Sequence, residues 1–280
     1  MLLRLAGALV RACLVVLLIA TPSLLLPGMT SDTAQIVTLV ALFGAGLTIF
    51  EYASSYPGLI EFRDAPPFNR IRFSSLFLTV VLLALLSRGQ IMPSTLTMIV
   101  EQIGASVGRV IDFPYSPVRL VVLMLPPDAS VEHIELVRNS AGISYLISLI
   151  TLAIFIILQR VRRWPIRTGS FNVWVNLPTF DPTAGGDVVE RLERDARFNI
   201  ALGFLLPFLT PAVVKSATSL FGAVSLENPH TLVWTVAAWA FLPASLFMRG
   251  IAMGRIAAMI AEKRLRQKTD DEGHEGLLPA

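Results

Sequence analysis

Charged residues are scarce in this chain, and their scarcity excludes an ordinary water-soluble fold. They make up 15% of the 280 residues, whereas 54% are hydrophobic. A soluble domain usually carries about 25% charged residues. So many apolar side chains cannot all be buried in one water-soluble core, because the surface of that core must be covered by polar groups. The composition therefore predicts a membrane protein.

Residue types on which catalysis and metal binding depend are also rare. The single cysteine, Cys13, excludes an internal disulfide framework, and its place in an apolar run indicates a packing role. His133, His230 and His274 lie outside the middle of every apolar run, so neither a membrane haem nor a zinc site is expected. The sequence has no phosphate-binding loop, nucleophile elbow or zinc-protease motif. We therefore expect no enzymatic activity and no cofactor.

Long uncharged runs separate the regions in which charges are concentrated. The runs span Ala12–Ser31, Thr33–Phe50, Phe73–Ser87, Asn139–Gln159, Phe198–Val214 and Asn228–Met248. A helix that crosses the hydrocarbon core needs about 20 mostly apolar residues. The sequence thus predicts an all-α bundle of six transmembrane helices, over residues 5–26, 33–50, 71–87, 140–159, 198–222 and 230–250. We expect one membrane domain, residues 1–268, in which the first helix is retained and Arg72 reaches toward the lipid headgroups.

Arginines are unevenly distributed between the predicted helices and indicate the orientation of the chain. Arg4 and Arg11 lie at the start of helix one, and the other arginines are concentrated between helices two and three, between four and five, and after helix six. The alternate segments contain only Arg88, Arg109, Arg119 and Arg138. Because cytoplasmic loops carry the excess of Lys and Arg, both termini are expected in the cytoplasm. The charges are thereby explained without nucleic-acid binding. The preference for Arg over Lys indicates a bacterial genome rich in G and C, and we therefore expect a protein of the bacterial inner membrane.

The outer segment between helices three and four, residues 89–139, contains three patterned stretches. Ser94–Asp112 has apolar residues at helical spacing and is expected to lie as an amphipathic helix on the membrane surface. Val118–Leu125 is too short to cross the membrane, so it is a strand or a short segment packed against the bundle. Val131–Asn139 is expected to form a separate short helix.

The inner segment, residues 160–197, and the C-terminal tail are more polar. Ser170–Leu177 alternates apolar and polar residues, which is typical of a strand. A helix is then expected from Asp187, which follows Gly185-Gly186 and acts as a cap rather than as part of an anion site. This helix runs into helix five. The tail, residues 269–280, is predicted to be disordered.

Lys215 is the strongest candidate for a functional residue. It lies in the fifth apolar helix after Pro207 and Pro211, whose rings leave backbone carbonyl groups without their helical partners. Ionisable residues in interrupted membrane helices form ion and solute sites in transporters. The structural alternative is that Lys215 extends to the outer surface or pairs with Glu227 or Glu101.

Small residues recur at intervals of four near the end of helix six, at Gly250, Gly254 and Ala258. This spacing allows helices to approach closely in membranes. We expect the stretch to pack within the chain, with Ala41 and Ala45 of helix two as a possible groove. Its alternative role is to form a face for a partner.

The sequence as a whole favours a non-enzymatic accessory, assembly or scaffold component of a membrane complex. Its partners would be the lipid bilayer and other membrane-protein subunits or a second copy of the chain. The alternative is a small-solute or ion transporter that uses the Pro-interrupted fifth helix and Lys215.

Reporter fusions test the predicted topology. The periplasmic reporter should be active after Gly28, Ser106 and Pro229, and the cytoplasmic reporter after Pro66, Thr183 and Ala280. Because positively charged loops stay in the cytoplasm, each group of fusion sites should activate only its own reporter. Consistent reversal of one neighbouring pair would remove a helix from the predicted six.

Overall fold

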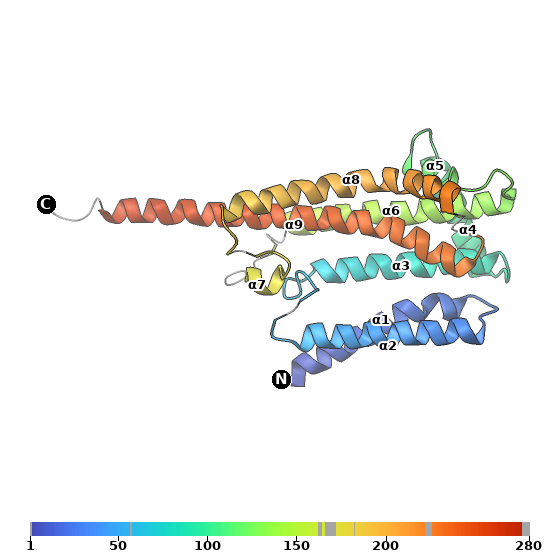
Figure 1. Cartoon of the computed structure of the whole chain (residues 1–280), viewed down its shortest axis with the longest axis horizontal. Coiled ribbons are helices and arrows are strands. Elements are labelled where there is room, and N and C mark those ends of the chain that lie inside the picture. The colour runs from blue at the N-terminus through green and yellow to red at the C-terminus, as the bar shows by residue number, and fades with distance from the viewer. Residues whose placement is uncertain are drawn as a thin grey trace.

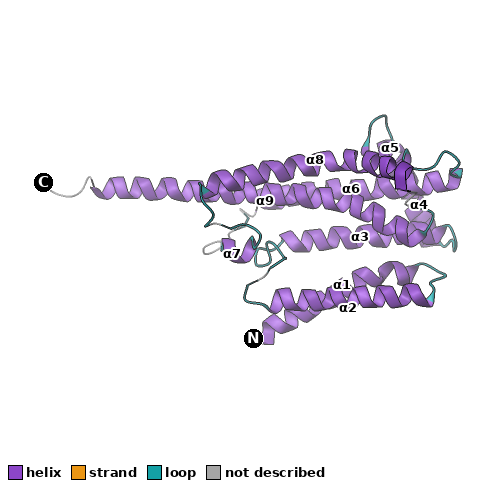
Figure 2. Ribbon diagram, viewed as in Figure 1, coloured by secondary structure: helices purple, strands orange, loops and turns teal. Residues whose placement is uncertain are grey.

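A computed structural model of the chain describes residues 2–56, 58–161, 164–165, 172–181, 183–221 and 226–275. In these residues all regular structure is helical and no strand is present (Figure 2). The helices are α1 (Leu2–Leu25), α2 (Ser31–Ala53), α3 (Phe68–Gly89), α4 (Thr95–Ile111), α5 (Pro117–Val122), α6 (Val131–Val161), α7 (Val173–Asn176), α8 (Val188–Phe221) and α9 (Pro229–Glu275).

Six helices of the described residues are long and apolar enough to cross a membrane, namely α1, α2, α3, α6, α8 and α9. This confirms the predicted all-helical fold and its six helices of membrane-spanning length. Figure 1 shows α1 and α2 as a pair beside the other four long helices. Helix α1 begins and α9 ends at the same end of the bundle, which we call the terminal end, while α4 and α5 lie at the opposite end.

Hydroxyl side chains determine where several helices begin. Thr30 Oγ1 accepts a hydrogen bond from the backbone N–H of Thr33 at the start of α2. Ser94 and Thr97 form a reciprocal capping box at the start of α4, and Ser116 caps α5. Each cap satisfies an N–H group that has no partner within its own helix.

For the segment between α3 and α6, the structure corrects one prediction and selects between the two alternatives of another. Residues 131–139 form no separate helix, because they continue without a break into α6. Of the two alternatives for Val118–Leu125, the structure has the packed segment, since α5 is a short helix whose Val118 and Val121 are buried. Helix α4 agrees with the predicted amphipathic helix in its bounds. Its location on the membrane surface stays a prediction.

Two further differences concern the more polar segments. The strand predicted over Ser170–Leu177 is wrong where it is described, because Val173–Asn176 forms the single turn α7. Asn172 caps this turn by accepting the N–H of Val175, and residues 170–171 lie outside the described residues. Helix α9 continues to Glu275, whereas the sequence predicts a disordered tail from residue 269. Residues 276–280 of that tail lie outside the described residues.

Helices α4 and α6 cross through a contact between glycines that the sequence analysis missed. A Cβ atom placed on Gly142 of α6 would lie 2.7 Å from the Cα of Gly108 in α4. Gly104 and Gly108 are four residues apart, which is the same small-residue spacing noted in helix six. The opposite, apolar side of α4 is exposed, with Ile99 and Ile103 about half accessible.

Glycines also bring α8 and α9 into backbone contact. A Cβ atom on Gly203 would lie 2.7 Å from the carbonyl oxygen of Pro243, and one on Gly250 would lie 2.7 Å from that of Ala196. The small residues of helix six therefore pack within the chain, but against α8 rather than against α2. Gly254 lies at an ordinary distance, since its Cβ atom would be 3.7 Å from Ala196 Cβ. Ala258 is exposed.

Alanine substitutions at Gly250 and Gly254 test the contact between α8 and α9. Gly250→Ala places a methyl group against a backbone oxygen that cannot move aside, and such overpacking costs about 1–3 kcal/mol. Gly254→Ala adds the same group in open contact and gains about 1 kcal/mol of helix propensity. We expect Gly250→Ala to lower the Tm in detergent and Gly254→Ala to leave it unchanged or raise it. Equal melting of the two variants would contradict the contact at Gly250.

Candidate functional site: the terminal-end cap and the crevice beside it

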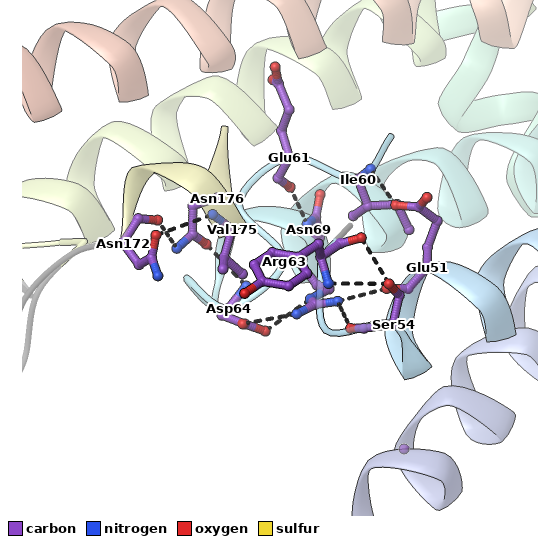
Figure 3. Close-up of polar contacts among 12 residues, drawn as sticks. Glu51, Ser54, Ile60, Glu61, Arg63, Asp64, Asn69, Asn172, Val175 and Asn176 are labelled. Carbon is purple, nitrogen blue, oxygen red and sulfur yellow. Dashed lines mark hydrogen bonds and ion pairs between the residues drawn. The ribbon is translucent and has the colours of Figure 1, made fainter. Parts of the chain in front are cut away.

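Two loops cover the terminal end of the bundle and form a structured cap. We define this cap as residues 54–56 and 58–67, between α2 and α3, together with residues 172–181, which include α7. Asn176 joins the two loops, because its backbone oxygen accepts the N–H of Phe62 at 2.7 Å (Figure 3). Its side-chain Oδ1 accepts the N–H of Asp64 at 3.1 Å. The cap is therefore held together by contacts between segments far apart in the sequence.

The end of α2 is fixed to the first loop by Glu51 and Arg63. Glu51 is 3% exposed as a residue, and its carboxylate accepts the backbone N–H groups of Gly58, Leu59 and Ile60 at distances of 2.9–3.1 Å (Figure 3). The Arg63 guanidinium donates to the carbonyl oxygens of Glu51 and Ser54, at 2.8 and 2.7 Å. A cation at a helix C-terminus is favourable because the last carbonyl groups have no helical partners.

Phe62 occupies the centre of the cap in a strained backbone conformation. Its φ angle is 52°, in the left-handed region that non-glycine residues rarely adopt, and its side chain is fully buried. The ring packs on Phe68 and Trp164, with centroids 4.4 and 5.5 Å away. Trp164 also donates its indole N–H to the carbonyl oxygen of Ala65 at 3.1 Å. Such strain costs about 1–3 kcal/mol and persists only where the surroundings impose it.

An ion pair ties the cap to α9. Glu61 points from the loop toward the long helices (Figure 3), and both of its carboxylate oxygens bind Arg249, at 2.6 and 2.8 Å. Thr179, from the second loop, donates its hydroxyl to the same carboxylate at 2.7 Å. Bidentate arginine pairs of this kind combine charge with fixed geometry. Both loops and α9 thus meet at Glu61.

Asp187 connects the start of α8 to α9 beyond the cap. Its Oδ1 accepts the backbone N–H of Val189 at 2.6 Å, so the residue caps α8 as the sequence predicts. Its carboxylate also accepts Arg264 at 2.8 Å. The N–H of Val189, followed by the Arg264 guanidinium, lowers the pKa of Asp187 below its ordinary value. The carboxylate is therefore ionised at neutral pH.

A crevice of about 1040 Å³ opens beside the cap, between α1, α2 and α3. The polar residues that line it include Arg11, Tyr52, Glu61, Arg70 and Arg72. Apolar residues of α1 and α3 line the remainder. Helix α2 lies against α1 alone among the described helices, which leaves the space between α2 and α3 open.

The side chain of Arg72 contacts residues of α3 and α9 inside the bundle, and the predicted reach of this arginine toward the lipid headgroups stays a prediction. Its Nε donates to Ser245 Oγ of α9 at 2.5 Å, and its Nη1 donates to Asn69 Oδ1 at 3.3 Å. The guanidinium lies over the rings of Phe68 and Phe241, 5.4 and 5.7 Å from their centroids. Arg72 is therefore held on the wall of the crevice from several sides.

Pro207 and Pro211 lie away from the cap, in a helix that remains continuous. Because Pro211 has no N–H, the carbonyl oxygen of Pro207 lacks its helical partner. The indole N–H of Trp239 in α9 donates to that oxygen at 3.1 Å, and the contact is buried. The prolines thus generate a contact between α8 and α9 within an unbroken α8.

Lys215 lies further along α8 and contacts the opposite end of the bundle. Its Nζ donates to the carbonyl oxygen of Leu123, which follows the last residue of α5, at 2.6 Å. An ammonium group there interacts favourably with the unpartnered carbonyl groups of a helix end. The structure therefore does not bring Lys215 together with Gly250 or with the crevice, and it joins α8 to α5.

Sequence reasoning missed the residues that build the cap, above all Glu51, Glu61 and Asn176. The available signal is weak: three carboxylates, Glu51, Glu61 and Asp64, lie among the arginines of a turn-rich segment. Among the described residues, no group of three or more His, Cys, Asp or Glu could hold a metal ion. No protein-family model, curated protein or solved structure matches the chain, so function is argued from this geometry.

Substitutions of Lys215 test its structural role against a role in transport. Lys215→Ala removes the hydrogen bond to α5, and we expect a loss on the order of 1 kcal/mol because the ammonium is exposed. Lys215→Arg should retain most of the stability, since a guanidinium can donate to the same oxygen. The measurement is the Tm in detergent, with the exposed neighbour Val213→Ala as control. Unchanged stability of Lys215→Ala together with loss of the cellular phenotype would contradict the structural role.

Proposed function

We propose that the protein is a non-enzymatic accessory, assembly or scaffold component of a membrane complex. The observation that carries the proposal is the cap, whose two loops are held together and to α9 by Glu61, Asn176 and Arg249. Long loops without secondary structure are uncommon unless they serve binding or catalysis. An ordered loop surface is suited to contacting another protein.

The exposed surface of the cap supports a role in docking. Trp174 of α7 is 55% exposed, and Tyr56 and Leu59 of the first loop are 80% and 68% exposed. Tryptophan and tyrosine dominate the energetics of protein interfaces, particularly when a rigid scaffold presents them. Helix α9 also extends beyond the cap (Figure 1), which adds a second surface at the same end.

The proposed location is the bacterial inner membrane, with the terminal end in the cytoplasm. This orientation rests on the arginines, because most of them lie in the start of α1, in the segment from the end of α2 to the start of α3, in the segment from the end of α6 to the first turns of α8, and in the later part of α9. The cap and the extended part of α9 would then meet cytoplasmic or membrane-embedded partners.

The alternative is a small-solute or ion transporter that uses α8. The sequence features that favour it are Lys215 and the carbonyl groups that lose their helical partners because Pro207 and Pro211 have no N–H. Within the described residues the Pro207 carbonyl is bonded to Trp239, and Lys215 is bonded to Leu123. These contacts favour a packing role for both features and therefore favour the accessory component.

Affinity purification from native membranes tests the proposal. We expect a stoichiometric partner to co-purify with the unaltered protein, and at least ten-fold less of it to be recovered with Trp174→Ala. Loss of a buried aromatic anchor costs about 2 kcal/mol or more, which corresponds to such a factor. The control is Phe113→Ala, because Phe113 is 56% exposed at the opposite end of the bundle.

Two results would contradict the accessory role at the cap. One is that the protein purifies alone or as a homomer under conditions that retain other membrane complexes. The other is that Trp174→Ala and Phe113→Ala recover the same amount of partner while both retain the Tm of the unaltered protein.

A further inference from the structure

We propose that the crevice between α1, α2 and α3 binds the phosphate group of an anionic phospholipid, with the acyl chains lying along its apolar wall. The proposal goes beyond the accessory role and does not depend on it. It rests on three arginines that line one end of the crevice and on the side chains that extend it into the bundle.

Within the described part of the chain, the arginines of the crevice have no carboxylate in direct contact, although Glu61 attracts Arg72 over a longer distance. Among the described residues, Arg11, Arg70 and Arg72 form no ion pair within 4.0 Å, although seven other arginines do. Arg72 is only partly exposed and is held by neutral groups and by aromatic rings. A guanidinium kept within a membrane helix bundle is costly unless an anion or water accompanies it.

Arg11 is fixed on the facing wall. Its Nη1 donates to the carbonyl oxygen of Gly7 at 2.7 Å, and the guanidinium lies over the ring of Tyr52, 4.5 Å from its centroid. Arg70 is exposed at the start of α3 and lines the same crevice. Guanidinium groups from α1 and α3 thus line one crevice, and a planar guanidinium fork suits the oxygens of a phosphate group.

The one carboxylate among the residues that line the crevice, Glu61, does not cancel this charge. Both of its oxygens are bonded to Arg249, which lies outside the lining residues. Arg11, Arg70 and Arg72 therefore leave the polar end of the crevice with an excess of positive charge. An anion that enters it gains charge-assisted hydrogen bonds without having to displace an existing carboxylate.

The rest of the lining favours a lipid over a free anion. Val10 and Leu14 of α1 are 62% and 40% exposed, and with Phe73 of α3 they form an apolar wall next to the arginines. A phosphate group at the arginines would place acyl chains along this wall. With the terminal end in the cytoplasm, this arrangement matches the inner leaflet, where basic pockets between helices bind anionic headgroups.

The experiment measures binding of defined ligands to the purified full-length chain in detergent by native mass spectrometry and by the shift in Tm. The ligands are phosphatidylglycerol, phosphatidylcholine and glycerol phosphate at equal concentrations. The variants are Arg11→Gln and Arg70→Gln, singly and combined, and Val10→Trp, which fills the apolar wall. Arg160→Gln is the matched control, because Arg160 is an exposed arginine of α6 outside the crevice.

We expect phosphatidylglycerol to bind and raise the Tm, with at least ten-fold weaker binding to the combined arginine variant and unchanged binding to Arg160→Gln. Phosphatidylcholine, whose headgroup has no net charge, should bind at least ten-fold more weakly. Val10→Trp should weaken the binding of phosphatidylglycerol and leave the binding of glycerol phosphate unchanged. If the combined variant does not fold, the single variants should each weaken binding at least three-fold.

Other outcomes would overturn the proposal in distinguishable ways. Glycerol phosphate that binds as tightly as phosphatidylglycerol, with no effect of Val10→Trp, would identify a site for a soluble phosphate and exclude the lipid. Equal binding of both lipids would exclude recognition of charge. Equal weakening by Arg70→Gln and Arg160→Gln would show that lipid binds through general surface charge and not in the crevice.

Discussion

The backbone contact between α8 and α9 at Gly250 determines where the cap can attach. Arg249 directly precedes Gly250 in α9. The distance between the axes of α8 and α9 at Gly250 therefore fixes the distance from the Arg249 guanidinium to the Glu61 carboxylate. That carboxylate also accepts Thr179, and through it the two loops of the cap are joined to the bundle. A side chain at Gly250 would move α9 outward and lengthen an ion pair in which both groups are largely buried. The close packing of α9 on α8 at Gly250 thus controls the geometry of the ion pair between Glu61 and Arg249.

A second constraint is that polar groups inside a membrane bundle need partners within the protein. The structure meets it mostly with hydroxyl and indole groups between helices. Thr151 of α6 donates to Ser75 of α3 at 2.8 Å, and Ser148 of α6 donates to the carbonyl oxygen of Ala240 in α9 at 2.9 Å. Trp239 satisfies the carbonyl group that Pro211 frees. These bonds fix the rotation of α6 and α9, because lipid offers the polar groups no alternative partner.

The six spans could be predicted because their signal is local: about 20 apolar residues are needed for each, and charges mark their ends. The cap could not, because its hydrogen bonds join residues more than 100 positions apart. Alternation over residues 171–176 predicts a strand, but a strand needs a neighbouring strand with which to pair. In the structure, Asn172 caps the turn α7, and Asn176 accepts a hydrogen bond from the first loop. Small-residue spacing predicted close helix contact at Gly250 but not its partner, since the spacing itself carries no information on which helix is faced.

Glu61 belongs both to the cap and to the lining of the crevice, and this links the two. While Arg249 holds both carboxylate oxygens, Glu61 acts on Arg72 only through the longer-range Coulombic attraction between the two groups. If the cap loosened and that pair separated, the free carboxylate would compete with any anion for the same guanidinium groups. Coulombic interactions between a carboxylate and nearby guanidinium groups are strong where solvent is excluded. The order of the cap and the anion affinity of the crevice are therefore coupled, and a partner that stabilises the cap would also strengthen binding in the crevice.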